Sequence, residues 1–95
     1  MEKYKEGIHF LKFGADWCLP CRSMEIILNE FETDHINRVS IHRFNVDVEN
    51  ELTTKFNIKS IPTIIIIKNG ENIDKISGSQ TSQTLLERLE YAESQ

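Results

Sequence analysis

The apolar positions along this chain change their period several times, and each change predicts a new element. Residues 8–14 form a largely apolar run of strand length, which is typical of a strand covered on both faces. Residues 39–46 and 63–68 are further runs rich in β-branched residues and predict two more strands. Asn69-Gly70 tolerates the positive φ angles of a tight hairpin, so residues 72–77 are predicted to return antiparallel to the preceding strand.

Apolar residues at helical spacing predict three helices between and after these strands. The first is expected from Leu19 to about Glu32. A short second helix carries Leu52 and Phe56 and ends near Asn57. Thr81 suits the N-cap of a last helix, whose apolar stripe consists of Leu85, Leu86, Leu89 and Ala92.

The resulting order of elements is βαβαββα, without internal repeats. Two strand–helix units followed by a hairpin and a helix predict an α/β fold with a small mixed sheet and helices on both faces. The chain has 95 residues and no Pro/Gly/Ser-rich linker, so we expect one domain over residues 1–95.

Charge and the lengths of the apolar runs narrow the classes of function. The formal net charge is -4, and the Lys and Arg residues are scattered, so no basic patch predicts binding to nucleic acid. The apolar stretch over residues 8–13 is too short for a secretory signal. The run over residues 61–67 is far below the roughly 20 residues that span a bilayer. We therefore expect a soluble cytoplasmic protein with no membrane and no nucleic-acid partner.

The chain has two cysteines, Cys18 and Cys21, separated by two residues. Pro20 suits the first turn of the predicted helix, which places the Cys18 sulfur at a helix N-terminus, where free N–H groups and the helix dipole favour a thiolate. Cys21 follows one turn later, near enough to close a disulfide with Cys18 and to displace a bound substrate sulfur. In a reducing cytosol such a pair favours redox catalysis, redox sensing or metal binding.

Two other interpretations of the pair stay open on the residues alone. The cysteines could bind zinc with His35 and His42, although the gaps of 13 and 6 residues fit a zinc finger poorly and the histidines are expected beyond the helix end and inside a strand. The pair could also be buried and inert, although a helix start beside Trp17 and Pro20 favours an exposed, activated thiol. No metal site is predicted.

The segment Ala15-Asp16-Trp17-Cys18-Leu19-Pro20-Cys21-Arg22 resembles the active-site segment of thioredoxins. Ile61-Pro62-Thr63 resembles their cis-proline loop, and Asn69-Gly70-Glu71 and Gly78 match the family in spacing. The resemblance covers nearly the whole chain from about Ile8. The chain looks like a shortened thioredoxin that lacks the opening strand and most of the first helix of full-length members.

This resemblance implies a thioredoxin-like fold and a thiol-disulfide oxidoreductase that reduces protein disulfides without a bound cofactor. Cys18 would attack the client disulfide, and Cys21 would release the product. The electron donor would be a flavin reductase that uses NADPH, although a shortened chain could use a different donor, as glutaredoxins use glutathione. The client-binding surface would include Trp17, Pro20, Ile61 and Pro62.

The chain departs from the family pattern beside the cysteines. Thioredoxins usually carry a buried aspartate six residues before the first cysteine, and here that position is Lys12. The family's partner position, often lysine, is Arg43, so two cations would lie near the cysteines at a cost unless they are compensated. Glu25 follows Cys21 by four positions and shares its helix face, which makes it the expected partner of Lys12.

We therefore predict that Glu25, held by Lys12, accepts the proton that Cys21 must lose before it resolves the mixed disulfide. In the alternative interpretation, the Lys12 ammonium reaches water and Glu25 is merely solvated. The nearby positive charge should favour the thiolate form and make the protein a weaker reductant. Three other functions stay open: a glutaredoxin-like reductase, a disulfide isomerase or oxidase, and a redox-sensing adaptor without enzymatic activity.

Overall fold

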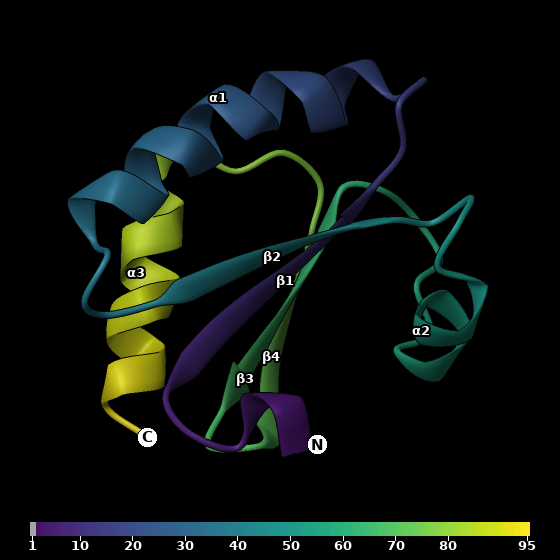
Figure 1. Cartoon of the computed structure of the whole chain (residues 1–95). Helices are drawn as coiled ribbons and strands as arrows, with labels where there is room; N and C mark the ends of the chain where they lie inside the picture. Colours follow the sequence, from purple (N-terminus) through teal and green to yellow (C-terminus); the bar gives the residue numbers. More distant parts are fainter. Residues whose placement is uncertain (1) are drawn as a thin grey trace.

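A mixed sheet of four strands forms the centre of the computed structural model, which describes residues 2–95 (Figure 1). The strands are β1 (Ile8–Gly14), β2 (Ser40–Asn45), β3 (Thr63–Lys68) and β4 (Glu71–Ser77), in the spatial order β2-β1-β3-β4. β2 runs parallel to β1, whereas β3 runs antiparallel to both β1 and β4. The predicted mixed sheet and its hairpin are therefore confirmed.

The helices follow the predicted order, as α1 (Leu19–Asp34), α2 (Asn50–Lys55) and α3 (Ser82–Glu93). α1 continues past the predicted end at Glu32. A short 3-10 helix, η1 (Glu2–Tyr4), precedes β1 and was not predicted. Within residues 2–95, no helix is long and apolar enough to cross a membrane.

Alternation of side chains along β3 explains why helices cover both faces of the sheet, because successive residues of a strand point to opposite faces. Ile64 and Ile66 belong to a core cluster with residues of α1 and α3, including Leu28. Ile65 and Ile67 belong to a second cluster, against which Leu52 of α2 packs. Figure 1 shows α2 separated from α1 and α3 by the sheet, as the sequence predicted.

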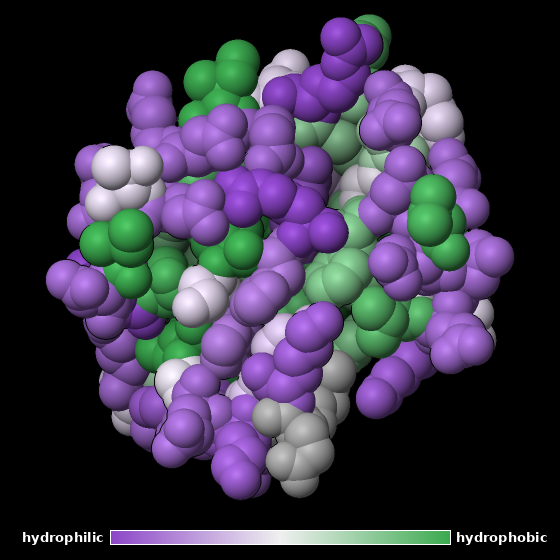
Figure 2. Space-filling view, viewed as in Figure 1, coloured by the Kyte–Doolittle hydropathy of each residue, from purple (hydrophilic) through white to green (hydrophobic). Residues whose placement is uncertain are grey.

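Polar residues cover most of the face seen in Figure 2, and apolar side chains appear between them in separate areas, including a band to the right of centre. This agrees with a chain whose large apolar residues are mostly buried in the two clusters. Apolar surface alone therefore does not mark the functional site.

Turn residues set both ends of β4 and the start of α3. Asn69 and Gly70 join β3 to β4 with φ angles of 50° and 85°, as a two-residue hairpin requires. Gly78 ends β4 with a φ of 88°, and its N–H donates to the Pro62 carbonyl at 2.8 Å. Thr81 then caps α3 as predicted, because its hydroxyl oxygen accepts from the N–H of Thr84 at 3.1 Å.

Candidate active site

Cys18 and Cys21 lie at the start of α1 and are joined by a disulfide bond, with their Cα atoms 5.3 Å apart. Cys18 is the N-cap of the helix, with an extended backbone (φ -91°, ψ 106°). The Cys21 N–H donates to the Cys18 Sγ at 3.2 Å. After reduction, this N–H and the helix dipole would favour a thiolate at Cys18. The helix start that was predicted at Cys18 is therefore present.

Both cysteines are more enclosed than the sequence suggested. Cys18 exposes 5% of its surface and Cys21 exposes 1%, so the expectation of an exposed Cys18 thiol is wrong for the disulfide form. The reason is a small apolar cluster in which Ala15 packs with both cysteines and Ile61 packs against them. The rim is open, because Trp17 is 68% exposed and Leu19 and Pro20 are also exposed.

The loop before β3 supplies the wall beside the cysteines. The Ile61–Pro62 peptide bond is cis, as the family resemblance implied. Pro62 is buried and Ile61 is half-buried. The Thr63 hydroxyl, just after the proline, donates to the Ser60 carbonyl at 2.7 Å and fixes the entry into β3. The loop thus brings Ile61 against the cysteine pair from far along the sequence, and the cis bond joins it directly to Pro62.

Trp17 lies over a shallow apolar groove of about 200 Å³ between the cysteines and α2. Its indole N–H donates to the Asp47 carboxylate at 2.9 Å, which fixes the direction of the exposed ring. Ile58 and Ile61 line the same groove. Asp47 was not identified from the sequence, because it follows a predicted strand thirty residues away from Trp17 and no local pattern links them.

Lys12 of β1 and Glu25 of α1 form the ion pair that the sequence predicted. Lys12 is 7% exposed, and its Nζ donates to Glu25 Oε2 at 2.9 Å and to the Cys21 carbonyl at 3.3 Å. The alternative in which the Lys12 ammonium reaches water is therefore wrong. Burial raises the pKa of Glu25, but hydrogen bonds and charge from Arg43 and Lys12 outweigh it and hold that pKa below its usual value.

Arg43 of β2 also binds Glu25, through its Nε and the Oε1 of the carboxylate. Its guanidinium reaches Glu32 at 3.2 Å and Asn29 at 3.0 Å as well. The sequence predicted two cations near the cysteines that would be costly unless compensated. The structure shows that Glu25 is bound by both cations, because Lys12 and Arg43 are paired in register on neighbouring strands.

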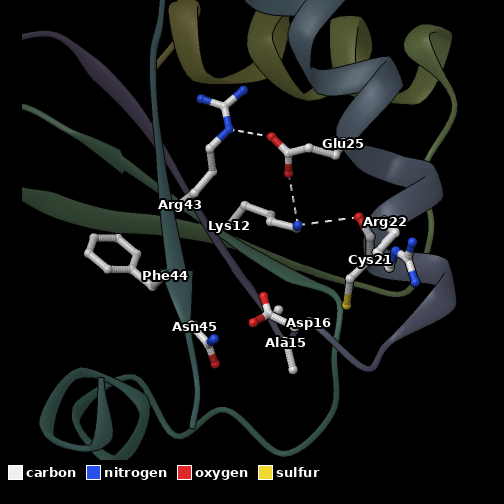
Figure 3. Close-up of a pocket in the computed structure, with 10 residues that line it drawn as sticks. Lys12, Ala15, Asp16, Cys21, Arg22, Glu25, Arg43, Phe44 and Asn45 are labelled. Carbon is white, nitrogen blue, oxygen red and sulfur yellow. Dashed lines mark hydrogen bonds and ion pairs between the residues drawn. The ribbon is translucent and has the colours of Figure 1, made fainter. Parts of the chain in front are cut away.

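These charges border a pocket of about 410 Å³ at the start of α1, shown in Figure 3. Lys12, Cys21 and Glu25 line it, and Phe44 and Asn45 form its β2 side. Figure 3 shows Lys12 between Glu25 and Cys21, with its Nζ directed to both. The pocket therefore connects the cysteine pair to the three bound charges.

Gly14 lines the same pocket and explains how closely its groups approach. A Cβ atom at this position would lie 3.2 Å from the Cys21 Sγ and 3.2 Å from the Lys12 Cε. A side chain there would have to displace one of them. Sequence reasoning treated Gly14 only as a strand end and missed this role.

The zinc interpretation does not fit the fold. His35 is the C-cap of α1 whereas Cys18 is its N-cap, so the two lie about 25 Å apart at 1.5 Å of rise per residue. His42 instead pairs with His9, with ring nitrogens 3.0 Å apart. Among the side chains of residues 3–95, no three His, Cys, Asp or Glu gather as metal ligands would.

Two cysteines one turn apart at a helix N-terminus, packed beside a cis-proline on a mixed sheet, define a thiol-disulfide oxidoreductase site of the thioredoxin-like class. The family model for thioredoxin matches residues 2–91. A thioredoxin of Staphylococcus saprophyticus is 34% identical over 89 residues, which cover 94% of this chain and 86% of the relative. A thioredoxin of Staphylococcus haemolyticus is 35% identical over 89 residues, with the same shares covered.

A solved structure agrees on the fold. The germline-specific thioredoxin Deadhead of Drosophila melanogaster is 22% identical and superimposes with a TM-score of 0.85. The match covers 95% of this chain and 85% of the Deadhead chain. The chain belongs to the thioredoxin family. It is accordingly a thiol-disulfide oxidoreductase with protein-disulfide reductase activity, and the family implies disulfide-containing client proteins and a reductase partner.

Proposed function

We propose that Cys18 is the nucleophile and Cys21 the resolving cysteine of this reductase. The Cys18 thiolate attacks one sulfur of a client disulfide, and the other client sulfur leaves as a thiolate. Cys21 then attacks the Cys18 sulfur and releases the second client thiolate, so two electrons pass to the client and the Cys18–Cys21 disulfide forms. The observation that carries this assignment is a hydrogen bond, which the Cys21 N–H donates to the Cys18 sulfur. Cys18 is the N-cap of the helix and the more exposed of the two cysteines.

The client would dock on the rim formed by Trp17, Pro20, Ile61 and Pro62. Among residues 2–95, neither the N–H nor the C=O of Ile61 has a backbone partner. These groups are available to an extended client segment, which would pair with them as an added strand pairs with a sheet edge. The exposed Trp17 ring, held by Asp47, offers apolar area for the residues next to the client cysteine.

Glu25 would accept the proton that Cys21 loses, and Lys12 would stabilise the resulting thiolate. Support comes from the pocket that all three residues line, which has room for water between the thiol and the carboxylate. Its low pKa keeps Glu25 ionised and therefore able to receive a proton. The same low pKa makes it a weak base, so the proton would pass on to solvent quickly.

The remaining assignments follow from the family. The chain would act as one domain over residues 1–95 in the cytoplasm, without a bound cofactor, and a flavin reductase that uses NADPH would return electrons to the disulfide. Lys12 stands where the family usually carries an acid, and its buried positive charge beside Cys21 favours the thiolate form and a less reducing potential. A protein of that kind could also serve as a disulfide oxidase or isomerase, and its measured potential would distinguish these functions.

The decisive experiment traps clients on a Cys21→Ser variant. Because the variant lacks the resolving thiol, mixed disulfides between Cys18 and client proteins should accumulate in a lysate and disappear on reduction. Cys18→Ser is the matched control and should trap far fewer clients. Equal trapping by both variants, or trapping by neither, would remove the proposed division of roles.

A second measurement tests the proton acceptor. We expect Glu25→Gln to slow resolution of a mixed disulfide by about tenfold or more near neutral pH, since the amide cannot accept the proton. The attack by Cys18 should change little. If resolution in Glu25→Gln followed the same pH dependence as in the unaltered protein, Glu25 would have no part in this step.

A further inference from the structure

Arg43 makes contacts near the cysteines that the proposed mechanism does not use. From β2 it crosses to α1 and binds Glu25, Asn29 and Glu32. These three residues lie four and three positions apart, so they form one face of the helix. The contacts hold the Arg43 guanidinium at three points and tie β2 to the middle and last turns of α1.

The two oxygens of Glu25 have separate partners. Oε1 binds Arg43, and Oε2 accepts from the Lys12 ammonium at 2.9 Å. Lys12 also donates to the Cys21 carbonyl at 3.3 Å. Because Arg43 occupies one oxygen, the carboxylate cannot turn without losing a hydrogen bond, and its other oxygen stays directed at Lys12. An unbroken set of contacts therefore runs from Arg43 to the resolving cysteine (Figure 3).

We propose that Arg43 is a positioning residue for the resolution step, which holds the Glu25 carboxylate in place as the proton acceptor of Cys21. The inference rests on the proposed function of Glu25. It adds that the acceptor depends on a residue from the neighbouring strand, one that touches neither sulfur. Arg43 thereby couples the packing of β2 against α1 to the rate at which a client is released.

Charge gives this positioning a pH signature. Besides Glu25 and Arg43, the charged groups that line the pocket are Lys12 of β1, Asp16 of the following loop and Arg22 of α1. Glu32 of α1 also forms an ion pair with Arg43. Burial alone raises the pKa of Glu25, and Arg43 and Lys12 together reverse that effect. Without Arg43 the pKa of Glu25 would rise, so the carboxylate would be protonated, and lost as an acceptor, at a higher pH than in the unaltered protein.

The test follows single turnovers of the reduced protein, in excess, with Ellman's reagent. This small aromatic disulfide releases one coloured thiolate when Cys18 attacks and a second when Cys21 resolves the mixed disulfide. In Arg43→Met we expect the second phase to slow about tenfold near neutral pH, because the carboxylate is no longer held in place, and to slow further as the pH falls, with the first phase changed less than about twofold. Arg43→Lys should restore part of the rate, because it keeps the charge.

The control is Arg38→Met, which removes an arginine of similar ion pairing, to Glu93 at 2.7 Å, at the far end of α1. It should leave both phases unchanged. An unaltered second phase in Arg43→Met, with a slow second phase in Glu25→Gln, would overturn the role of Arg43 and leave that of Glu25 intact. Normal second phases in both variants would overturn both roles.

A double variant separates positioning from general loss of structure. In a Glu25→Gln background, Arg43→Met should slow the second phase no further, because the acceptor it positions is already absent. Additional slowing as large as in the unaltered protein would show that Arg43 acts independently of Glu25, and the proposal would then be wrong. Thermal unfolding of each variant confirms that the proteins compared are folded.

Discussion

Lys12 is a buried cation on the central strand, and its surroundings explain why the fold tolerates it. Its ammonium has two acceptors, the Glu25 carboxylate and the Cys21 carbonyl. A buried charge costs several kcal/mol unless its partners are well placed. Such a residue adds little to stability compared with an apolar residue of the same size. Its position beside the redox pair lets its charge act on the sulfurs.

The variant Lys12→Met separates the effect of Lys12 on stability from its effect on the sulfurs. We expect the free energy of unfolding to stay within about 1 kcal/mol or to rise, because methionine fills the site and Glu25 keeps Arg43 as partner. The pKa of the Cys18 thiol should rise, because a nearby positive charge is lost. Alkylation rates of reduced protein across pH measure this, with Lys75→Met, at a distant surface cation, as the control. Superimposable alkylation curves would exclude a role for the Lys12 charge.

At the residue scale the sequence predicted the Lys12–Glu25 pair but not the part played by Arg43. The four-residue spacing of Cys21 and Glu25 gives a shared helix face, which is a local property of the sequence. The contact of Arg43 with Glu25 depends on the register that places Arg43 beside Lys12 across two strands. Register between distant strands comes from tertiary packing, so no local signal could assign one carboxylate to both cations.

The elements were predictable wherever a local rule determines the backbone. The Asn69-Gly70 hairpin and the capping of α3 by Thr81 were correct because turn and cap residues act on their own neighbours. Helix ends were less accurate: α1 runs to Asp34 because its last turn continues through a hydrogen bond from the His35 N–H to the Phe31 carbonyl at 3.0 Å. η1 was missed because three residues hold no periodic pattern.

The N-cap of α3 gives a testable prediction at the scale of a single element. Thr81 and Thr84 each bind the backbone N–H of the other, so Thr81→Ala removes a reciprocal cap. We expect a loss of about 1 kcal/mol in the free energy of unfolding with unchanged reductase activity, since α3 lies apart from the cysteines. Thr33→Ala is the matched control, because its hydroxyl only returns to the Asn29 carbonyl within α1. Equal losses in the two variants would argue against a special role for the cap.

At the scale of the whole molecule, the fold brings together residues that are far apart in sequence. β1 supplies Lys12, α1 supplies both cysteines and Glu25, β2 supplies Arg43, and the loop before β3 supplies the cis-proline. The cysteines and the proline were predictable because a family motif marks them. The Asp47 contact, the space at Gly14 and the enclosure of Cys18 follow from packing between elements, and therefore required the structure.

The opposite end of the sheet holds a second titratable group, which sets how the molecule responds to acid. His9 donates from Nε2 to the Glu6 carbonyl at 2.8 Å, so its Nδ1 is left to accept from the His42 Nε2–H at 3.0 Å. The buried Tyr4 ring packs against both imidazoles, with centroids 5.2 and 5.0 Å away. Burial, together with the charges of His9 and Lys3, lowers the pKa of His42, although Glu32 opposes the shift. η1 therefore packs on a hydrogen-bonded pair of histidines, of which His42 has the lowered pKa.

A lowered pKa in the folded state means that the unfolded chain binds more protons. Stability should then be complete above the unfolded pKa of about 6.5 and should fall as the pH drops below it, by at most about 1.4 kcal/mol per pH unit. His42→Gln keeps a donor for His9 but cannot be protonated, so between about pH 7.5 and 5.5 its free energy of unfolding should fall less than that of the unaltered protein. Chemical denaturation at the two pH values measures this, with His35→Gln as the control. Parallel losses in the unaltered protein and His42→Gln would show that acid weakens the fold elsewhere. Glu25 would not be that group, because its lowered pKa contributes stability that disappears only at more acidic pH.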